Sequence, residues 1–242
     1  MTTPKPPVSE LDASVQRLPG GTVAVVIAGG VSPTRNQVDW AIGRADSACV
    51  IAADSGADHA RELGLTVDVA VGDFDSVSDA TQAWLHTSGT RLDAHPETKD
   101  FSDLELALEL AAETAPDRIV ALGLSGGRAD HEFINLTVLA SDRWANKNVL
   151  GISDDTLVTV VRSKYVAIGE PGAVLSVVAV AGPARLTTDG LVFGLEDEEI
   201  SPTSSRGLSN AFKGSHATIT VSEGTALVFQ PAAGAYLWDA QP

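Results

Sequence analysis

Four apolar segments in the first half of the chain each end at a glycine or an aspartate, and helical patterns separate them. The segments are TVAVVIAGG (22–30), ACVIAAD (48–54), VDVAVGD (67–73) and RIVALG (118–123). Continuous apolar runs of this length are typical of strands buried on both faces. Strands that alternate with helices predict a mainly parallel, doubly wound α/β sheet, in which ligands gather at the carboxyl ends of the strands.

The helical segments carry recognisable ends. SDLELALELAAET (102–114) is the clearest, because Ser102 and Glu105 have the spacing of a capping box and Pro116 follows the last turn. A shorter helix is expected over 57–63, closed by a glycine, and another within HEFINLTVLASDRWA (131–145).

The pattern changes after about residue 150. Five β-branched segments follow at short spacing, punctuated by glycine and proline, with no convincing amphipathic helix between them. This composition predicts an all-β sandwich or barrel. We therefore expect a loose tail over 1–20, an α/β domain over 21–150 and a β-sandwich domain over 151–242.

Composition restricts the partners. A net charge of −16 over 242 residues argues against nucleic acid or an anionic membrane as the main partner. It does not exclude a nucleotide, because metal ions and a few basic groups can neutralise a site locally. The single cysteine, Cys49, lies in an apolar segment and is expected to be a buried, inert thiol. Without a signal-like start or an apolar run of about 20 residues, a soluble cytoplasmic protein is expected.

Carboxylates gather at the predicted strand ends. In GDFDS, Asp73 and Asp75 are two residues apart, so extended geometry puts both on one face where they can share a cation, although a simple turn is an alternative. In KDFSD, Asp100 and Asp103 precede the strong helix. Asp103 could merely complement the helix N-terminus, but we favour a second carboxylate arm of a metal site, with Lys99 close to phosphate.

Two further motifs are polar. GGRADH (126–131) follows a strand and opens a helix, so its backbone can approach an anion while Arg128 clamps phosphate oxygens. A Gly-Gly turn with a surface arginine is the alternative, and His131 alone is more typical of a hydrogen-bonded histidine than of a catalytic one. SSRGLSN (204–210) could bind a small molecule, but its composition alone favours a solvated hairpin loop.

Taken in order, these motifs resemble the thiamine pyrophosphokinase (thiamine diphosphokinase) family. The resemblance rests on an Asp-Ser-Gly-Ala segment with its continuation ELGLTVDVAVGDFDS, and on KDFSDLELAL, LGLSGGRADH, DGLVFGLEDEEIS and SSRGLSN. Two small departures, Ser55 for a glycine and Ser125 for a threonine, leave the chemistry intact. The resemblance implies an α/β nucleotide domain, a β-sandwich that binds thiamine, and a homodimer.

The implied reaction is pyrophosphoryl transfer: the thiamine hydroxyl attacks the β-phosphorus of Mg·ATP, and AMP leaves. The resemblance implies catalytic roles for Asp73, Asp100 and Asp103; Mg²⁺ ligands Asp54, Asp73, Asp75 and Asp103; ATP contacts Lys99, Gly126, Gly127, Arg128, Asp130 and His131; and thiamine contacts Ser204, Ser205, Ser209 and Asn210. The general base is expected to be Asp100 or Asp73. The aromatic residue that stacks on thiamine stays open among Phe212, Tyr236 and Trp238.

Two other functions remain open from the sequence. A metal-dependent phosphohydrolase could use the same carboxylates on water, but it would not need the polar loop at 204–210. A non-catalytic nucleotide sensor would keep the Gly-Gly-Arg turn but would not need five aspartates. The metal and phosphate motifs end at residue 131 and the loop lies in another domain, so one subunit could fold back to join them or two subunits could share the site. The resemblance implies that the site is shared between two subunits.

Overall fold

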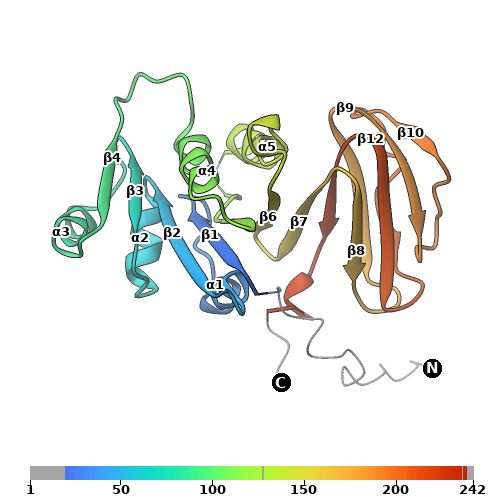
Figure 1. Ribbon diagram of the computed structural model, residues 1–242, viewed down its shortest axis with the longest axis horizontal. Coiled ribbons are helices and arrows are strands. Elements are labelled where there is room, and N and C mark those ends of the chain that lie inside the picture. The colour runs from blue at the N-terminus through green and yellow to red at the C-terminus, as the bar shows by residue number, and fades with distance from the viewer. Residues whose placement is uncertain (1–19, 127, 236, 239–242) are drawn as a thin grey trace.

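The computed structural model describes residues 20–126, 128–235 and 237–238. Most of the predicted tail therefore lies outside the described residues. Figure 1 shows an α/β part joined side by side to a strand-rich part. One continuous path of paired strands runs through both, in the order β10-β9-β12-β7-β6-β5-β1-β2-β3-β4, with β11 paired to β9 and β8 to β12.

The α/β part has six parallel strands. They are β1 (Thr22–Ile27), β2 (Ser47–Ala53), β3 (Val69–Gly72), β4 (Arg91–Ala94), β5 (Arg118–Leu122) and β6 (Asn148–Ser153). The helices are α1 (Arg35–Ile42), α2 (Gly56–Glu62), α3 (Asp79–Thr87), α4 (Asp103–Glu113) and α5 (Ala129–Val138), followed by the short 3₁₀ turn Asp142–Trp144.

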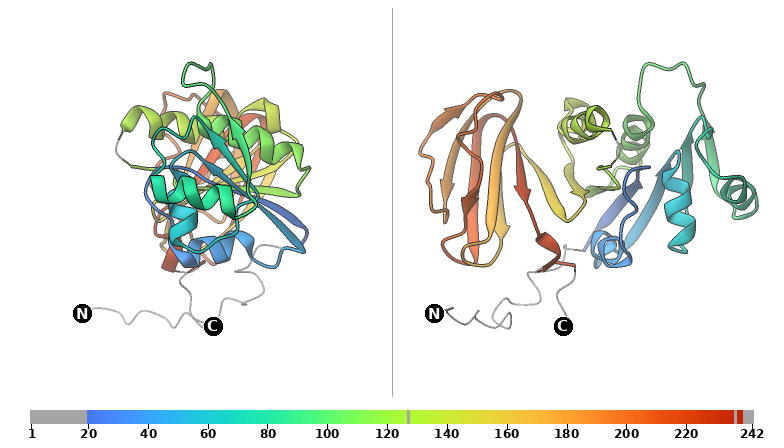
Figure 2. Two further views of the ribbon diagram at one scale, coloured as in Figure 1. Left: turned by 90° about the vertical axis from the view of Figure 1, so that its left-hand side faces the viewer. Right: turned by 180° about the vertical axis from the view of Figure 1, so that it is seen from behind.

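Both faces of this sheet are covered. Along β1, Val25 and Ile27 pack into the core under α1 and α2, whereas Ala24 and Val26 pack into the core under α4. The two helical layers are visible on opposite faces of the sheet in Figures 1 and 2. This arrangement confirms the predicted doubly wound α/β fold, and its strand order reverses direction at β1, between β2 and β5.

The strand-rich part contains β7 (Thr156–Val161), β8 (Lys164–Ile168), β9 (Val174–Asp189), β10 (Glu198–Ile200), β11 (Asn210–Ala211) and β12 (His216–Gln230), with a 3₁₀ turn at Ala233–Ala235. Strands β9 and β12 pair antiparallel along most of their length, with register shifts near Val221 and Thr225. Alternating residues of both strands, among them Val177, Leu186 and Ile219, enclose a separate core with Phe212. The predicted C-terminal strand-rich domain is confirmed.

The β6–β7 hairpin joins the two parts. Strand β6 pairs parallel with β5 and antiparallel with β7, so it belongs to the α/β sheet while leading into the strand-rich part. The division expected after residue 150 falls inside β6, because the hydrogen bonds of β6 to β5 continue to Ile152. No helix within the described residues is long and apolar enough to cross a bilayer.

Candidate active site

An acidic cluster lies at the carboxyl ends of two neighbouring strands. Asp54 follows β2, while Asp73 and Asp75 follow β3, and each residue offers a carboxylate oxygen within 4.8 Å of the others. Parallel pairing of Ala53 with Val71 brings these two strand ends together. The sequence prediction that Asp54, Asp73 and Asp75 converge therefore agrees with the geometry.

Lys99 enters the cluster from the loop before α4. Its Nζ lies 3.0 Å from Asp73 Oδ2 and 3.1 Å from Asp103 Oδ1, and its side chain is only 12 % exposed. Asp103 is the first residue of α4, and the preceding Ser102 caps that helix by accepting a hydrogen bond from the Glu105 amide at 3.2 Å. The capped helix start thus presents Asp103 to Lys99.

The carboxylates differ in their electrostatics. The hydrogen bond from Lys99 lowers the pKa of Asp73, whereas the negative charge of Asp73 raises the pKa of Asp75. Burial raises the pKa of Asp103. Burial opposes the charge of Lys99, but hydrogen bonds to Asp73 and Asp103 outweigh it and raise the lysine pKa. The result is a cluster with more negative than positive charge.

The cluster fits a divalent cation. Asp54 Oδ2 accepts a hydrogen bond from Ser76 Oγ, but its other carboxylate oxygen, Oδ1, is buried and has no hydrogen-bond partner within the part of the chain that is described. A buried acceptor without a partner is costly. A hard cation such as Mg²⁺ prefers carboxylate oxygens, so Asp54, Asp73 and Asp75 are suited to hold one.

The loops that follow β1 and β5 cross each other closely at glycine residues. This crossing lies where the strand order reverses. Gly30 donates from its amide to the Gly123 carbonyl at 3.0 Å, and a Cβ on Gly30 would lie only 2.1 Å from the Ser125 carbonyl oxygen. His59 Nε2 lies 2.8 Å from the Gly30 carbonyl oxygen. The sequence analysis assigned nothing to Gly30 or His59, although two glycines after a predicted strand were the available signal.

The predicted phosphate motif begins at this crossing. Arg128 is the N-cap residue of α5 and pairs with Asp130, with Nη2–Oδ2 and Nε–Oδ1 distances of 2.6 and 3.1 Å. The hydrogen bonds from Arg128 lower the pKa of Asp130 to about 2. Both side chains are exposed, as are His131 and Gly126, and Gly127 lies outside the described residues. Asp100 is also exposed and lies outside the acidic group.

The predicted thiamine loop lies at the other end of the path of strands, beside β9, β10 and β11. Ser205 and Ser209 are exposed, and Ser204 Oγ accepts a hydrogen bond from the Arg206 amide. Within a single chain, the strand path separates these residues from the acidic cluster after β2 and β3.

Asn210 has a structural role within this loop. Its side chain is buried, and its amide donates to the Phe193 carbonyl at 2.6 Å while its Oδ1 accepts from the amides of Phe193 and Ala211 at 2.9 Å. These bonds hold the Phe193 backbone, and the Phe193 side chain is 63 % exposed beside the loop. Phe193 lies within the DGLVFG segment quoted above, but no role was predicted for it from the sequence.

Phe212 and Trp238, two of the aromatic residues named from the sequence as candidates to stack on thiamine, are less exposed than Phe193. Phe212 is 1 % exposed inside the strand-rich core, and the Trp238 ring packs edge-on against Trp40 with centroids 5.5 Å apart. Tyr236 lies outside the described residues.

Two family models match the two parts of the chain. Residues 44–150 match the thiamin pyrophosphokinase catalytic domain, and residues 162–226 match the thiamin pyrophosphokinase vitamin B1 binding domain. The chain belongs to the thiamine pyrophosphokinase family. Both the acidic cluster and the Gly-Gly-Arg turn lie within the match to the catalytic domain.

Individual relatives agree with this membership of the thiamine pyrophosphokinase family. The chain is 36% identical over 89 residues to thiamine pyrophosphokinase of Bacillus subtilis, which covers 37% of this chain and 42% of that protein. It is 26% identical over 174 residues to thiamine pyrophosphokinase 3 of Oryza sativa, covering 67% of this chain and 64% of the relative. The chain thus spans less than two thirds of these curated relatives.

A solved structure extends the likeness over both parts of the fold. The crystal structure of Bacillus subtilis thiamine pyrophosphokinase superposes with a TM-score of 0.75 and 24% identity, covering 87% of this chain and 98% of that one. The fold of this thiamine pyrophosphokinase family member is therefore that of the solved relative.

Proposed function

We propose that this protein transfers a pyrophosphoryl group from ATP to the hydroxyl of thiamine, with Mg²⁺, giving thiamine diphosphate and AMP. The observation that carries the proposal is the cluster of Asp54, Asp73 and Asp75, with one buried carboxylate oxygen lacking a partner, in a chain of this family. A cytoplasmic location, with its supply of ATP, is part of the same proposal.

The acidic cluster is proposed to hold the metal. Asp54, Asp73 and Asp75 would be ligands, with Asp103 as a further one, and a bound Mg²⁺ would neutralise charge on the phosphate oxygens. Lys99 keeps Asp73 and Asp103 in place through its two ion pairs. The proton of the attacking hydroxyl is proposed to pass to Asp73 or to Asp100, whose side chain is exposed.

Arg128 is proposed to bind the phosphates of ATP. It opens α5 at the point where the strand order reverses, and among the described residues its side chain has only an exposed ion pair with Asp130 to give up. Exposed pairs contribute little stability, so exchange of Asp130 for a phosphate costs little. Gly126, Gly127, Asp130 and His131 belong to the same proposed phosphate-binding turn.

Thiamine is proposed to bind at the loop 204–210. Ser204, Ser205 and Ser209 supply hydroxyls, and the exposed ring of Phe193 offers a flat apolar surface for an aromatic ligand. Asn210 contributes by holding the Phe193 backbone rather than by direct contact.

The active form is proposed to be a homodimer with shared sites. The metal cluster follows β2 and β3, whereas the thiamine loop adjoins β9 and β10, near the opposite end of the strand path. A second subunit related by two-fold symmetry could bring its loop to the first subunit's cluster.

Subunit mixing tests this assembly. Asp75→Asn subunits and Ser209→Ala/Asn210→Ala subunits should each be inactive alone. After random exchange, half of the dimers are mixed and each carries one competent site, so about a quarter of wild-type activity should return. No recovery after confirmed exchange would place each site within one chain.

The reaction itself is tested by measuring AMP release from Mg·ATP with and without thiamine. AMP that appears only with thiamine, together with thiamine diphosphate, supports the kinase. Phosphate released without thiamine would instead identify a phosphohydrolase, and nucleotide binding without turnover would identify a sensor.

A further inference from the structure

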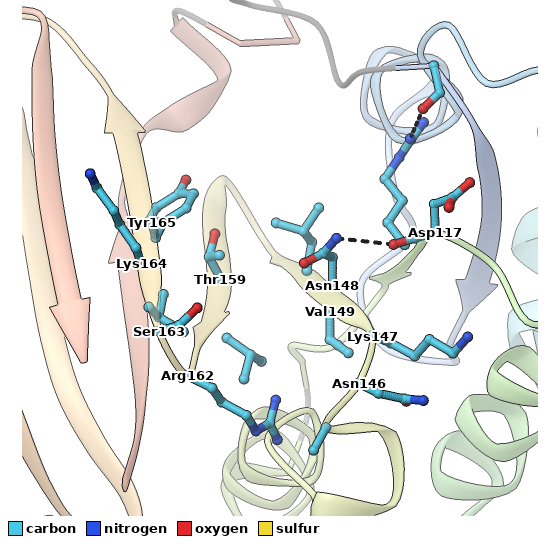
Figure 3. A pocket seen from close by; sticks show the side chains of 16 residues that line it. Asp117, Asn146, Lys147, Asn148, Val149, Thr159, Arg162, Ser163, Lys164 and Tyr165 are labelled. Atoms are coloured by element: carbon cyan, nitrogen blue, oxygen red, sulfur yellow. Dashed lines mark hydrogen bonds between the residues drawn. The ribbon is translucent and has the colours of Figure 1, made fainter. Parts of the chain in front are cut away.

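Strands β6 and β7 form a fork where the α/β sheet passes into the strand-rich part. They pair with each other only over residues 150–153 and 156–159. Before this stretch, residues 148–149 stay with β5, while after it residues 160–161 pair with β12. The diverging strands border a cavity of about 390 Å³, shown in Figure 3.

Basic residues line this cavity, and the ammonium end of Lys147 points away from it and donates to the Pro116 carbonyl at 3.4 Å (Figure 3). Arg118, Lys147, Arg162 and Lys164 line it, in a chain that has 16 basic residues against 32 acidic ones. Figure 3 shows Arg162 and Lys164 on the side of β7 and β8, and Lys147 on the side of β6. Among the described residues, Lys147, Arg162 and Lys164 form no ion pair. Asp117 acts on Lys147 and Asp142 acts on Arg162 at longer range. Three cations without a close ion pair at one cavity are still unexpected when acids are twice as common.

Two polar groups at the cavity are buried without a partner. Thr159 is 7 % exposed, and neither its Oγ1 nor the Nε of Arg162 has a hydrogen-bond partner within the described ranges. The guanidinium of Arg162 is held in place because its Nη2 donates to the carbonyls of Ala140 and Ser141, at 2.7 and 3.1 Å. Buried donors without acceptors destabilise a fold unless a ligand or water supplies the acceptor.

One carboxylate lies at the rim, but it is engaged elsewhere. Asp117 Oδ2 accepts from the Thr22 amide at 2.7 Å and from Thr22 Oγ1 at 3.0 Å. These bonds lower the pKa of Asp117 and tie its carboxylate to β1. Asp117 therefore does not neutralise Arg162 or Lys164 on the opposite side of the cavity.

We propose that this fork cavity binds a small phosphate-bearing anion. Its volume lies in the range of small-molecule sites. Two or three unpaired cations match the charge of a phosphate or diphosphate better than that of a single carboxylate, and the unpartnered hydroxyl and Nε can donate to its oxygens.

The fork cavity is distinct from the acidic cluster. Arg118 and Asn148 are the first residues of β5 and β6, so the cavity lies at the amino ends of these parallel strands. Asp54 and Asp73 follow the carboxyl ends of β2 and β3, at the opposite edge of the sheet. A ligand in the cavity would touch both arms of the fork and restrain the strand-rich part against the α/β part.

The test uses the full chain and inorganic pyrophosphate in buffer with EDTA. Without a divalent cation, the acidic cluster repels anions, so calorimetric binding of pyrophosphate reports on basic sites. We expect saturable binding that weakens about tenfold or more in Lys164→Glu. Lys213→Glu is the matched control, because Lys213 is also an exposed lysine without an ion pair among the described residues, but it lies outside the cavity. The Asp73→Asn variant should bind as the wild type does.

Thr159→Val provides a second test inside the cavity. It removes the unpartnered hydroxyl with little change in side-chain volume, so the free protein should keep or raise its melting temperature while pyrophosphate affinity falls. Amide shifts of residues 148–149 and 160–161 on titration would locate the ligand in the fork.

The proposal is overturned if wild type shows no saturable binding, or if Lys164→Glu and Thr159→Val both bind as wild type does. It is also overturned if Lys213→Glu weakens binding as much as Lys164→Glu. Parallel titrations with AMP and with thiamine diphosphate ask whether the phosphate group alone is recognised. If AMP or thiamine diphosphate binds as tightly as pyrophosphate does, the cavity recognises the phosphate group alone. If AMP or thiamine diphosphate binds more tightly than pyrophosphate does, that compound is the larger phosphate-bearing ligand of the same cavity.

Discussion

Asn210 distinguishes a residue that holds a binding loop from one that touches the ligand. Its buried amide makes three hydrogen bonds to the backbone, two to Phe193 and one to the adjacent Ala211 amide. We expect Asn210→Ala to destabilise the protein, because the Phe193 N–H and C=O lose these partners. Loss of thiamine binding would then follow from the displaced loop.

The magnitude follows from the bonds removed. Each hydrogen bond contributes about 0.5–1.5 kcal/mol net, so three amount to about 1.5–4.5 kcal/mol in the free energy of unfolding. For a chain of this length each kcal/mol lowers the melting temperature by about 2–4 °C, which predicts a decrease of about 3–18 °C. The lower half of that range is expected, since the Phe193 backbone is partly exposed and water can replace the lost partners.

The assay is calorimetric unfolding combined with thiamine titration. Ser209→Ala is the matched control, because its exposed hydroxyl has no hydrogen bond among the described residues, and its melting temperature should change by no more than about 2 °C. Phe193→Ala should weaken thiamine binding while leaving stability nearly unchanged, since its side chain is 63 % exposed. An Asn210→Ala protein that melts like wild type but no longer binds thiamine would refute the reasoning and make Asn210 a direct contact.

Three further predictions concern charged residues. Asp73→Asn or Asp75→Asn should abolish AMP release while the circular dichroism spectrum stays unchanged, because a lost carboxylate removes charge that Mg²⁺ needs; near-normal turnover at saturating Mg²⁺ would exclude both residues from the metal site. Arg128→Ala should weaken ATP binding far more than thiamine binding in separate titrations, and a loss confined to thiamine would mean that the two pockets are reversed. Asp58 has a folded-state pKa below its ordinary value: burial opposes this, but hydrogen bonds from Ser78 and Thr81 outweigh it. The stabilisation of the fold by ionised Asp58 is therefore present above the unfolded pKa of about 4 and is lost as the pH falls through the lowered folded pKa. Asp58→Asn should therefore reduce the loss of stability in acid. An unchanged dependence of stability on pH would contradict this prediction.

Local patterns were enough for much of the α/β part. The four apolar segments became β1, β2, β3 and β5, and Ser102 caps α4 as its spacing indicated. Helices α1 and α3 were not predicted, although they are longer than α2, which was. The capping box of Thr34 and Gln37 was nevertheless readable as the start of α1.

In the strand-rich part, glycines were misleading as markers of strand ends. Gly182 and Gly224 separated segments that look like individual strands, yet each lies inside one long strand, β9 or β12. Both glycines have positive φ angles, 151° and 78°, and lie where the pairing of β9 with β12 shifts register. A glycine can end a strand or bend it, and only the partner strand decides which.

The sequence by itself determined the acidic cluster, because parallel strands that end in aspartates must bring those ends to one edge of the sheet. It also determined family membership, through motifs that keep their order. Tertiary structure decided what each polar side chain contacts: Lys99 lies between two carboxylates, Asn210 holds a loop, and basic residues of the fork line one cavity. Those contacts join residues that are distant in the chain. The distances between these residues depend on how the strands pair and diverge, and the spacing of residues within a short segment of sequence does not determine this.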